Sequence, residues 1–118
     1  MSIIENKTLV ELHEGLRKKE FTSVELTKET FERIHALEPK VEAFVTLNEE
    51  EALKQAAAAD EKGYGEEASL QGLPIGIKDN IVTRDLLTTA SSRMLEDFNP
   101  IYDAHVMELL KAEGAVNV

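Results

Sequence analysis

The 118 residues of this chain are enough for one small domain with a modest core, and 42% of them are hydrophobic. A formal net charge of −10 disfavours direct binding to a nucleic-acid backbone or to an anionic membrane. The absence of cysteine excludes disulfides, thiol nucleophiles and thiolate metal sites. Because no export signal or membrane-length apolar run is seen, we expect a soluble, cytoplasmic protein.

Residues 1–62 are predicted to be mainly helical. Apolar side chains recur at helical spacing over 9–19 and over 23–37. Each run is preceded by a threonine with a glutamate three residues later, the spacing of a capping box: Thr8 with Glu11, and Thr22 with Glu25. Pro39 disfavours helical geometry at the residue before it, so the second helix should end there.

The next segment predicts a strand, a third helix and a loop. β-branched and aromatic residues at 41–47 favour a strand or an extended passage. Asn48 is a predicted N-cap for an alanine-rich helix that ends at Gly63. The glutamates at the start of this helix are typical of a solvated helix N-terminus, and residues 63–71 lack periodicity and read as a loop.

Residues 72–118 predict a strand, a loop with a short helix at 91–96, and a final helix. The alternation of GLPIGIK favours a strand with Ile75 and Ile77 on one face. Asp103 and Gly114 are the predicted caps of the last helix, and AVNV at 115–118 begins like another strand. We expect one domain over 1–118, with helices packed on a partial mixed sheet, in the α/β class.

Lys78 stands at the end of this apolar run, where a buried ammonium group would be costly. The local sequence alone favours an ion-paired or snorkelling lysine. The neighbouring Asp79 and Asn80 favour a turn over a substrate contact. The three histidines, His13, His35 and His105, are too scattered along the sequence for a metal site. No glycine-rich phosphate loop is present in the sequence.

The stretch from residue 70 to 116 contains GLPIGIKDN, then TTASS, then MLEDFNPIYDA, and this combination resembles the amidase signature family. Within that family it is most similar to the A subunits of glutamyl-tRNA(Gln) amidotransferases. The helices that precede it resemble the N-terminal part of the same subunits. The resemblance implies an incomplete amidase-signature α/β/α fold, of which this sequence looks like roughly the first quarter.

The resemblance implies a Ser-Ser-Lys triad that hydrolyses an amide, and by motif Lys78 is its general base. A lysine acts as a base only when it is unprotonated, and apolar surroundings favour that form. The two triad serines belong to a GGSSGGS-type segment that does not occur in this sequence. Ser91 and Ser92 lack the glycines that expose a nucleophile and its oxyanion donors, so we expect no catalytic role for them.

The complete enzyme implied by the resemblance releases ammonia from glutamine. A partner B subunit then uses ATP and magnesium to convert Glu-tRNA(Gln) to Gln-tRNA(Gln), with a C subunit also present and tRNA bound only through the complex. No cofactor is expected in this chain, which we expect to be inactive alone. Two departures from the family pattern are His105, where a small hydroxyl residue is usual, and Asn117.

Two other interpretations stay open. The chain could be a non-catalytic interaction module that docks other subunits, or that self-associates through an open sheet edge. It could also be part of a general amidase instead of a tRNA-linked one, since the motif around Lys78 is common to both.

Overall fold

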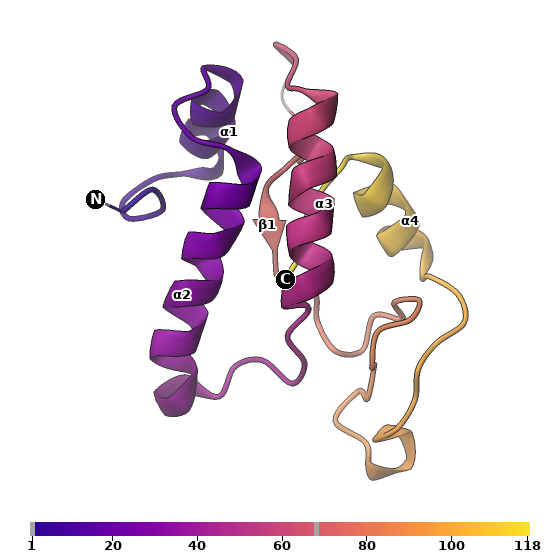
Figure 1. Cartoon of the computed structure of the whole chain (residues 1–118). Helices are drawn as coiled ribbons and strands as arrows, with labels where there is room; N and C mark the ends of the chain where they lie inside the picture. Colours follow the sequence, from indigo (N-terminus) through magenta and orange to yellow (C-terminus); the bar gives the residue numbers. More distant parts are fainter. Residues whose placement is uncertain (1, 68) are drawn as a thin grey trace.

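The computed structural model describes residues 2–67 and 69–118. Its elements in chain order are α1 (Leu9–Arg17), α2 (Ser23–Val41), α3 (Glu49–Lys62), β1 (Pro74–Ile75), the 3-10 helix η1 (Arg93–Leu95), α4 (His105–Ala112) and β2 (Val116–Asn117). Helices α2 and α3 stand side by side in front of β1, and α4 lies beyond α3 (Figure 1). The predicted α/β architecture is confirmed.

The sheet consists of two short parallel strands. Pro74 pairs with Val116 and Ile75 with Asn117, so the described sheet is parallel and not mixed. The Val116 amide donates to the Leu73 carbonyl at 2.9 Å. The predicted strand at 115–118 is confirmed in its centre. The strand predicted through Lys78 is shorter, because no further strand pairs with residues 76–78 among the described residues.

Both predicted capping boxes are present. The Thr8 amide donates to the Glu11 carboxylate at 2.6 Å, and the Glu11 amide donates to the Thr8 hydroxyl at 3.2 Å. Thr22 and Glu25 repeat the same exchange at the start of α2. Helix α1 ends two residues earlier than predicted, because Lys19 adopts a left-handed conformation with φ +59°.

The prediction that α2 stops before Pro39 is wrong, since the helix continues to Val41. Proline in a helix removes one backbone donor and crowds the preceding turn, and in the last turn little helix remains to be disturbed. The end is instead fixed by Glu42, which is left-handed. The Glu38 carboxylate accepts hydrogen bonds from the amides of Ala43 and Phe44, which stabilises this termination.

Val41 is the last residue of α2 and residues 42–48 form a loop without a strand, so the strand alternative for 41–47 is wrong. Helix α3 begins and ends where the sequence predicts, with Gly63 at its C-cap. Asn48 is the N-cap by position, but its side chain caps no helix amide. Its carboxamide donates instead to the Asn117 carbonyl at 3.0 Å, a contact across 69 positions that local reasoning does not reveal.

The cap predicted for the last helix is displaced by one residue at each end. Ala104 and not Asp103 is the N-cap of α4, and Glu113 precedes Gly114 at its C-terminus. The Asp103 carboxylate accepts from the Lys111 amine at 2.6 Å and from the Arg84 amide at 2.7 Å. It therefore joins α4 to the loop before it. The predicted short helix at 91–96 is confirmed as η1.

The core divides into two clusters. One lies between α1 and the start of α2, with Leu73 beneath them: Leu12, Leu16, Phe21, Leu26 and Leu73. The other lies where α2, α3 and the end of the chain meet: Phe31, Ala52, Ala56, Val116 and Val118. The buried alanines Ala52 and Ala56 on α3 are small enough to let its backbone approach Phe31 of α2 closely.

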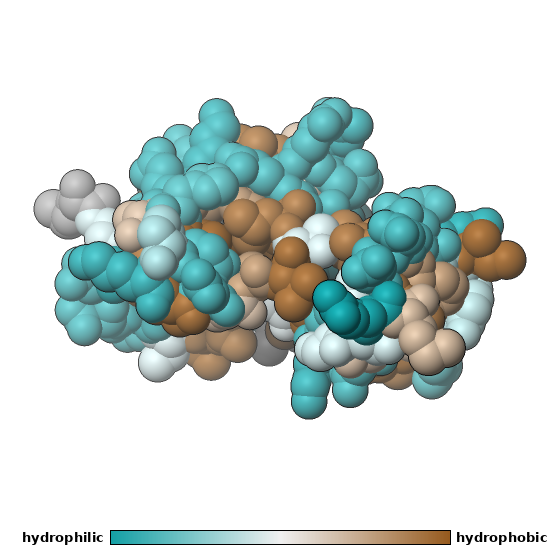
Figure 2. All heavy atoms as spheres, turned by 90° about the horizontal axis from the view of Figure 1, so that it is seen from below, coloured by the Kyte–Doolittle hydropathy of each residue, from teal (hydrophilic) through white to brown (hydrophobic). Residues whose placement is uncertain are grey.

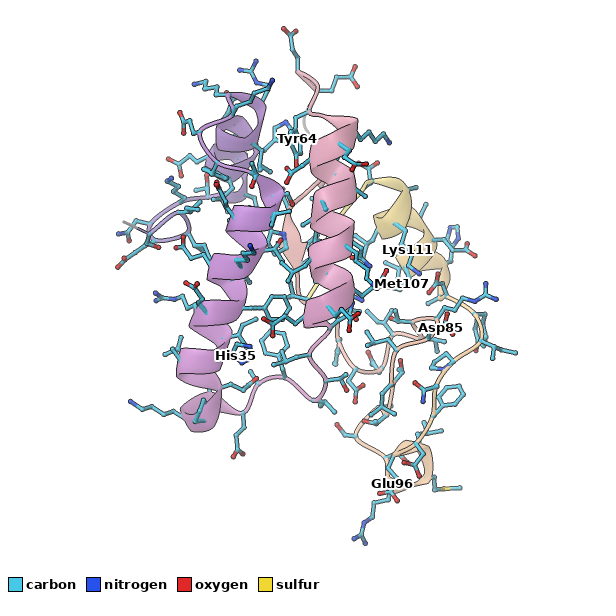
Figure 3. The ribbon with its side chains drawn as sticks, in the orientation of Figure 1. His35, Tyr64, Asp85, Glu96, Met107 and Lys111 are labelled. Carbon is cyan, nitrogen blue, oxygen red and sulfur yellow. The ribbon has the colours of Figure 1, made fainter. Side chains whose placement is uncertain are left out.

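Asp60 joins the end of α3 to the start of α2. Its carboxylate accepts from the amides of Ser23 at 2.8 Å and Val24 at 3.1 Å. The Tyr64 hydroxyl donates to the same carboxylate at 2.8 Å, and Tyr64 lies at the upper end of α3 (Figure 3). Burial, followed by the adjacent Asp60 carboxylate, raises the pKa of Tyr64 well above its usual range.

Candidate functional site

Lys78 lies on the loop directly after β1, at a turn in which the Ile81 amide donates to the Lys78 carbonyl at 3.0 Å. Its side chain is exposed, so the described residues do not provide the apolar enclosure expected from the sequence. Lys78 borders a cavity of about 380 Å³. The walls come from three regions, namely residues 43–46, the segment 76–88, and the end of β2.

Several polar side chains that were not predicted to belong to a site line this cavity. Thr83 and Thr88 are buried, and their hydroxyls donate to nearby backbone carbonyls at 3.1 Å and 3.0 Å. Asn117 is also buried and lies at the cavity wall. The threonines at positions 83, 88 and 89 of the sequence were the available signal for Thr83 and Thr88. Asn117 is brought to the cavity by the pairing of β2 with β1.

Asp79 connects the Lys78 turn to the loop at 88–91. Its carboxylate accepts from the Thr89 amide at 2.9 Å and from the Thr89 hydroxyl, and its carbonyl accepts from the Ala90 amide at 2.9 Å. Asp79 and Asn80 lie in a turn, as predicted. Partial burial by itself would raise the pKa of Asp79, but the hydrogen bonds from Thr89 outweigh it and hold that pKa below its usual range.

We expect the stability contribution of Asp79 to depend on pH. Because its pKa is lowered in the folded state, the contribution is fully present above the unfolded value of about 3.9 and is lost as the pH falls through the folded value. Asp79→Asn should therefore be less stable than the parent at pH 7, and the difference should shrink towards pH 2. Urea unfolding across this range, with Asp97→Asn as an exposed control, measures it. A difference that stays constant with pH would contradict the assignment.

The serines and histidines fall outside the Lys78 cavity. Ser91 is exposed, and the Ser92 hydroxyl accepts from the Met94 amide at 3.3 Å, which caps η1. His35 lies on α2 with its Nε2 2.9 Å from a Glu49 carboxylate oxygen (Figure 3). His105 is exposed at the start of α4, and His13 is buried on α1.

Within residues 2–67 and 69–118, no three His, Cys, Asp or Glu side chains are arranged to hold a metal ion. No helix in the same described part is both long and apolar enough to cross a membrane.

A second hollow, which we term the apolar groove, runs along α1 and α2 and has a volume of about 450 Å³. Its walls are mostly aliphatic and include Leu37, Val41 and Phe44, all of which are exposed. Phe44 borders both hollows. Seen from below, hydrophobic surface gathers in the middle of the molecule between hydrophilic regions (Figure 2).

The family of this chain follows from its match to a protein-family model. A family model described as Amidase matches residues 25–118. This chain belongs to the amidase family. Its Lys78 cavity and the turn around Asp79 both fall within the matched region.

The related sequences are glutamyl-tRNA(Gln) amidotransferase A subunits. The chain is 50% identical to the subunit from Limosilactobacillus reuteri and 53% identical to that from Enterococcus faecalis, covering 94% and 92% of this chain. The subunit from Geobacillus thermodenitrificans is 52% identical over the whole chain. The match spans only 22–24% of the length of these subunits, and the matching part is their N-terminal region.

Solved amidase structures have the same fold. The peptide amidase from Stenotrophomonas maltophilia matches with a TM-score of 0.88 and 32% identity, over 98% of this chain and 24% of that one. An amidase family protein from Bacillus anthracis matches with a TM-score of 0.87 and 27% identity, again over 98% and 24%. The helices and the parallel strand pair therefore correspond to part of the amidase fold.

Proposed function

We propose that this chain is the segment of a glutamyl-tRNA(Gln) amidotransferase A subunit that supplies the general base, Lys78, for hydrolysis of the glutamine side-chain amide. The proposal rests mainly on the position of the motif lysine, which lies beside a cavity of about 380 Å³ lined by buried threonines and an asparagine. Identity of 50–53% to A subunits supports the tRNA-linked reaction. The nucleophile and the relay serine are contributed from outside these 118 residues.

The partners follow from the same proposal. Ammonia would pass to a B subunit that uses ATP and magnesium, a C subunit would complete the assembly, and the complex would act in the cytoplasm. The net charge of −10 supports a role in which tRNA is bound by the partners and not by this chain. ATP and magnesium are assigned to the partner subunit, as the likeness to the A subunits implies.

A chimera tests the proposal. This chain would replace the matching segment of the Geobacillus thermodenitrificans A subunit, which it matches along its whole length. We expect the chimera, assembled with its B and C subunits, to hydrolyse glutamine. Because general bases typically contribute about 10²- to 10⁴-fold, Lys78→Ala should lower kcat by a factor in that range. The 118-residue chain alone should show no turnover.

Lys54→Ala is the matched control, because Lys54 is an exposed lysine on α3, outside the cavity. It should leave the kcat of the chimera unchanged. An active chimera that tolerates Lys78→Ala would refute the assignment of the base. A chimera that assembles with its B and C subunits but does not hydrolyse glutamine would favour a general amidase, to which the likeness with the peptide amidase structure points.

The apolar groove favours a second candidate function, that of an interaction module whose first partner is another copy of this chain. Exposed Leu37, Val41 and Phe44 would be covered in such a dimer, and burial of apolar surface would stabilise it. Light scattering across a dilution series should then show a dimer that Val41→Glu abolishes and Met94→Glu, on η1, does not. A monomer at every concentration would count against self-association, and binding of the purified C subunit would redirect the assignment to that partner.

A further inference from the structure

The turn that carries Lys78 is held by a residue other than the lysine itself. Within the turn, the Ile81 amide closes a hydrogen bond of 3.0 Å to the Lys78 carbonyl. Beyond the turn, Asp79 receives three hydrogen bonds from the 89–90 backbone and the Thr89 hydroxyl. Both carboxylate oxygens of Asp79 accept from Thr89, so this carboxylate is directed at the facing loop.

The facing loop needs such support. Ala90 and Ser91 have φ values of +49° and +57°, a left-handed conformation that is unfavourable for residues with a Cβ. Thr89 is 8% exposed, and its hydroxyl also accepts from the Ser91 amide at 3.2 Å. The Asp79 carboxylate therefore organises one buried threonine, which in turn organises the strained residues after it.

The two segments that this contact connects both line the Lys78 cavity. Residues 76–79, which end at Asp79, line one part of the cavity wall, and residues 86–88, which immediately precede Thr89, line another part. A link between Asp79 and Thr89 thus fixes the spacing of the cavity walls as well as the path of the chain at Lys78. Displacement of a catalytic group by about 1 Å can lower a rate by about 10²-fold.

We propose that Asp79 is the positioning residue of this site and that it acts through Thr89 to hold Lys78 and the cavity walls in their working arrangement. In this role Asp79 itself contacts no reacting group. The proposal rests on the proposed function, because a positioning role requires that Lys78 is the base. It assigns to the Asp79 side chain a role in catalysis that a simple turn residue would not have.

The chimera described above tests this proposal with two independent changes. Asp79→Asn keeps the shape of the side chain and removes its charge, and Thr89→Val removes the donating hydroxyl. Each should lower kcat by about 10- to 100-fold with KM within about 2-fold, because the reacting geometry and not substrate binding is disturbed. Thr89→Ser restores a hydroxyl and should restore most of kcat. Matched controls are Asp97→Asn, an exposed carboxylate, and Thr27→Val, a buried threonine outside the cavity.

Hydrogen exchange provides a second readout, measured on the 118-residue chain outside the chimera, with and without Asp79→Asn. The Thr89 amide donates to the Asp79 carboxylate, so Asp79→Asn should weaken that bond and accelerate exchange at Thr89, while the amides of α2 keep their protection. Loss of kcat in Lys78→Ala with full kcat in Asp79→Asn and Thr89→Val would overturn the positioning role and leave the proposed function intact. Equal loss of kcat in Thr89→Val and Thr89→Ser would also overturn it. Full activity in Lys78→Ala would instead refute the proposed function itself.

Discussion

Replacing Phe31 with alanine is expected to destabilise the protein by about 3–5 kcal/mol, the usual cost of deleting a buried phenylalanine side chain. Phe31 is 1% exposed and lies in the cluster that joins α2, α3 and the end of the chain. Its neighbours Ala52 and Ala56 are small, and they sit on a helix whose close approach already fixes their positions. They cannot refill the space, so a cavity should remain.

Urea unfolding followed by circular dichroism measures this change. Leu37→Ala is the matched control, because Leu37 lies on the same helix but is 46% exposed, and it should cost well under half as much. A small domain has a total stability of only about 5–15 kcal/mol, so Phe31→Leu serves as a milder variant if the alanine variant unfolds. Equal effects of Phe31→Ala and Leu37→Ala would show that the cluster is not the centre of the core.

Local sequence rules predicted the elements whose ends are stabilised locally. The capping boxes of α1 and α2 each need only residues three positions apart, and both are present. Predictions failed where a hydrogen-bond partner far along the sequence took the capping side chain, or where a left-handed residue set the end of a helix. Asn48 bonds to Asn117 instead of capping α3, and Asp103 bonds to Lys111 and Arg84 instead of capping α4.

The candidate site divides in the same way. The resemblance identified Lys78 as the motif lysine from the sequence, and the structure locates that residue beside a cavity. The sequence did not predict the link between Asp79 and Thr89, because it joins residues ten positions apart through a loop with no periodicity. The sequence also overestimated the burial of Lys78, since isoleucine neighbours indicate an interior only when further strands or helices cover them.

The second large effect is expected at Asp60, whose replacement by alanine should destabilise the protein by about 2–3 kcal/mol. The first four amides of a helix lack partners within the helix. In α2, Glu25 accepts from the Thr22 amide, Thr22 accepts from the Glu25 amide, and the Asp60 carboxylate accepts from Ser23 and Val24. Removing Asp60 leaves the amides of Ser23 and Val24 without their acceptor. The Tyr64 hydroxyl loses the same acceptor.

Because Asp60 belongs to α3, the same change should also loosen the contact between α3 and the start of α2. Hydrogen exchange should therefore increase at Ser23 and Val24 first, while the amides near Phe31 stay protected under native conditions. Glu61→Ala changes the exposed neighbouring carboxylate and should have little effect, and Tyr64→Phe should cost about 1 kcal/mol. If Asp60→Ala cost no more than Glu61→Ala, the helix start would be held by its capping box alone, and the interhelical carboxylate would contribute nothing to stability.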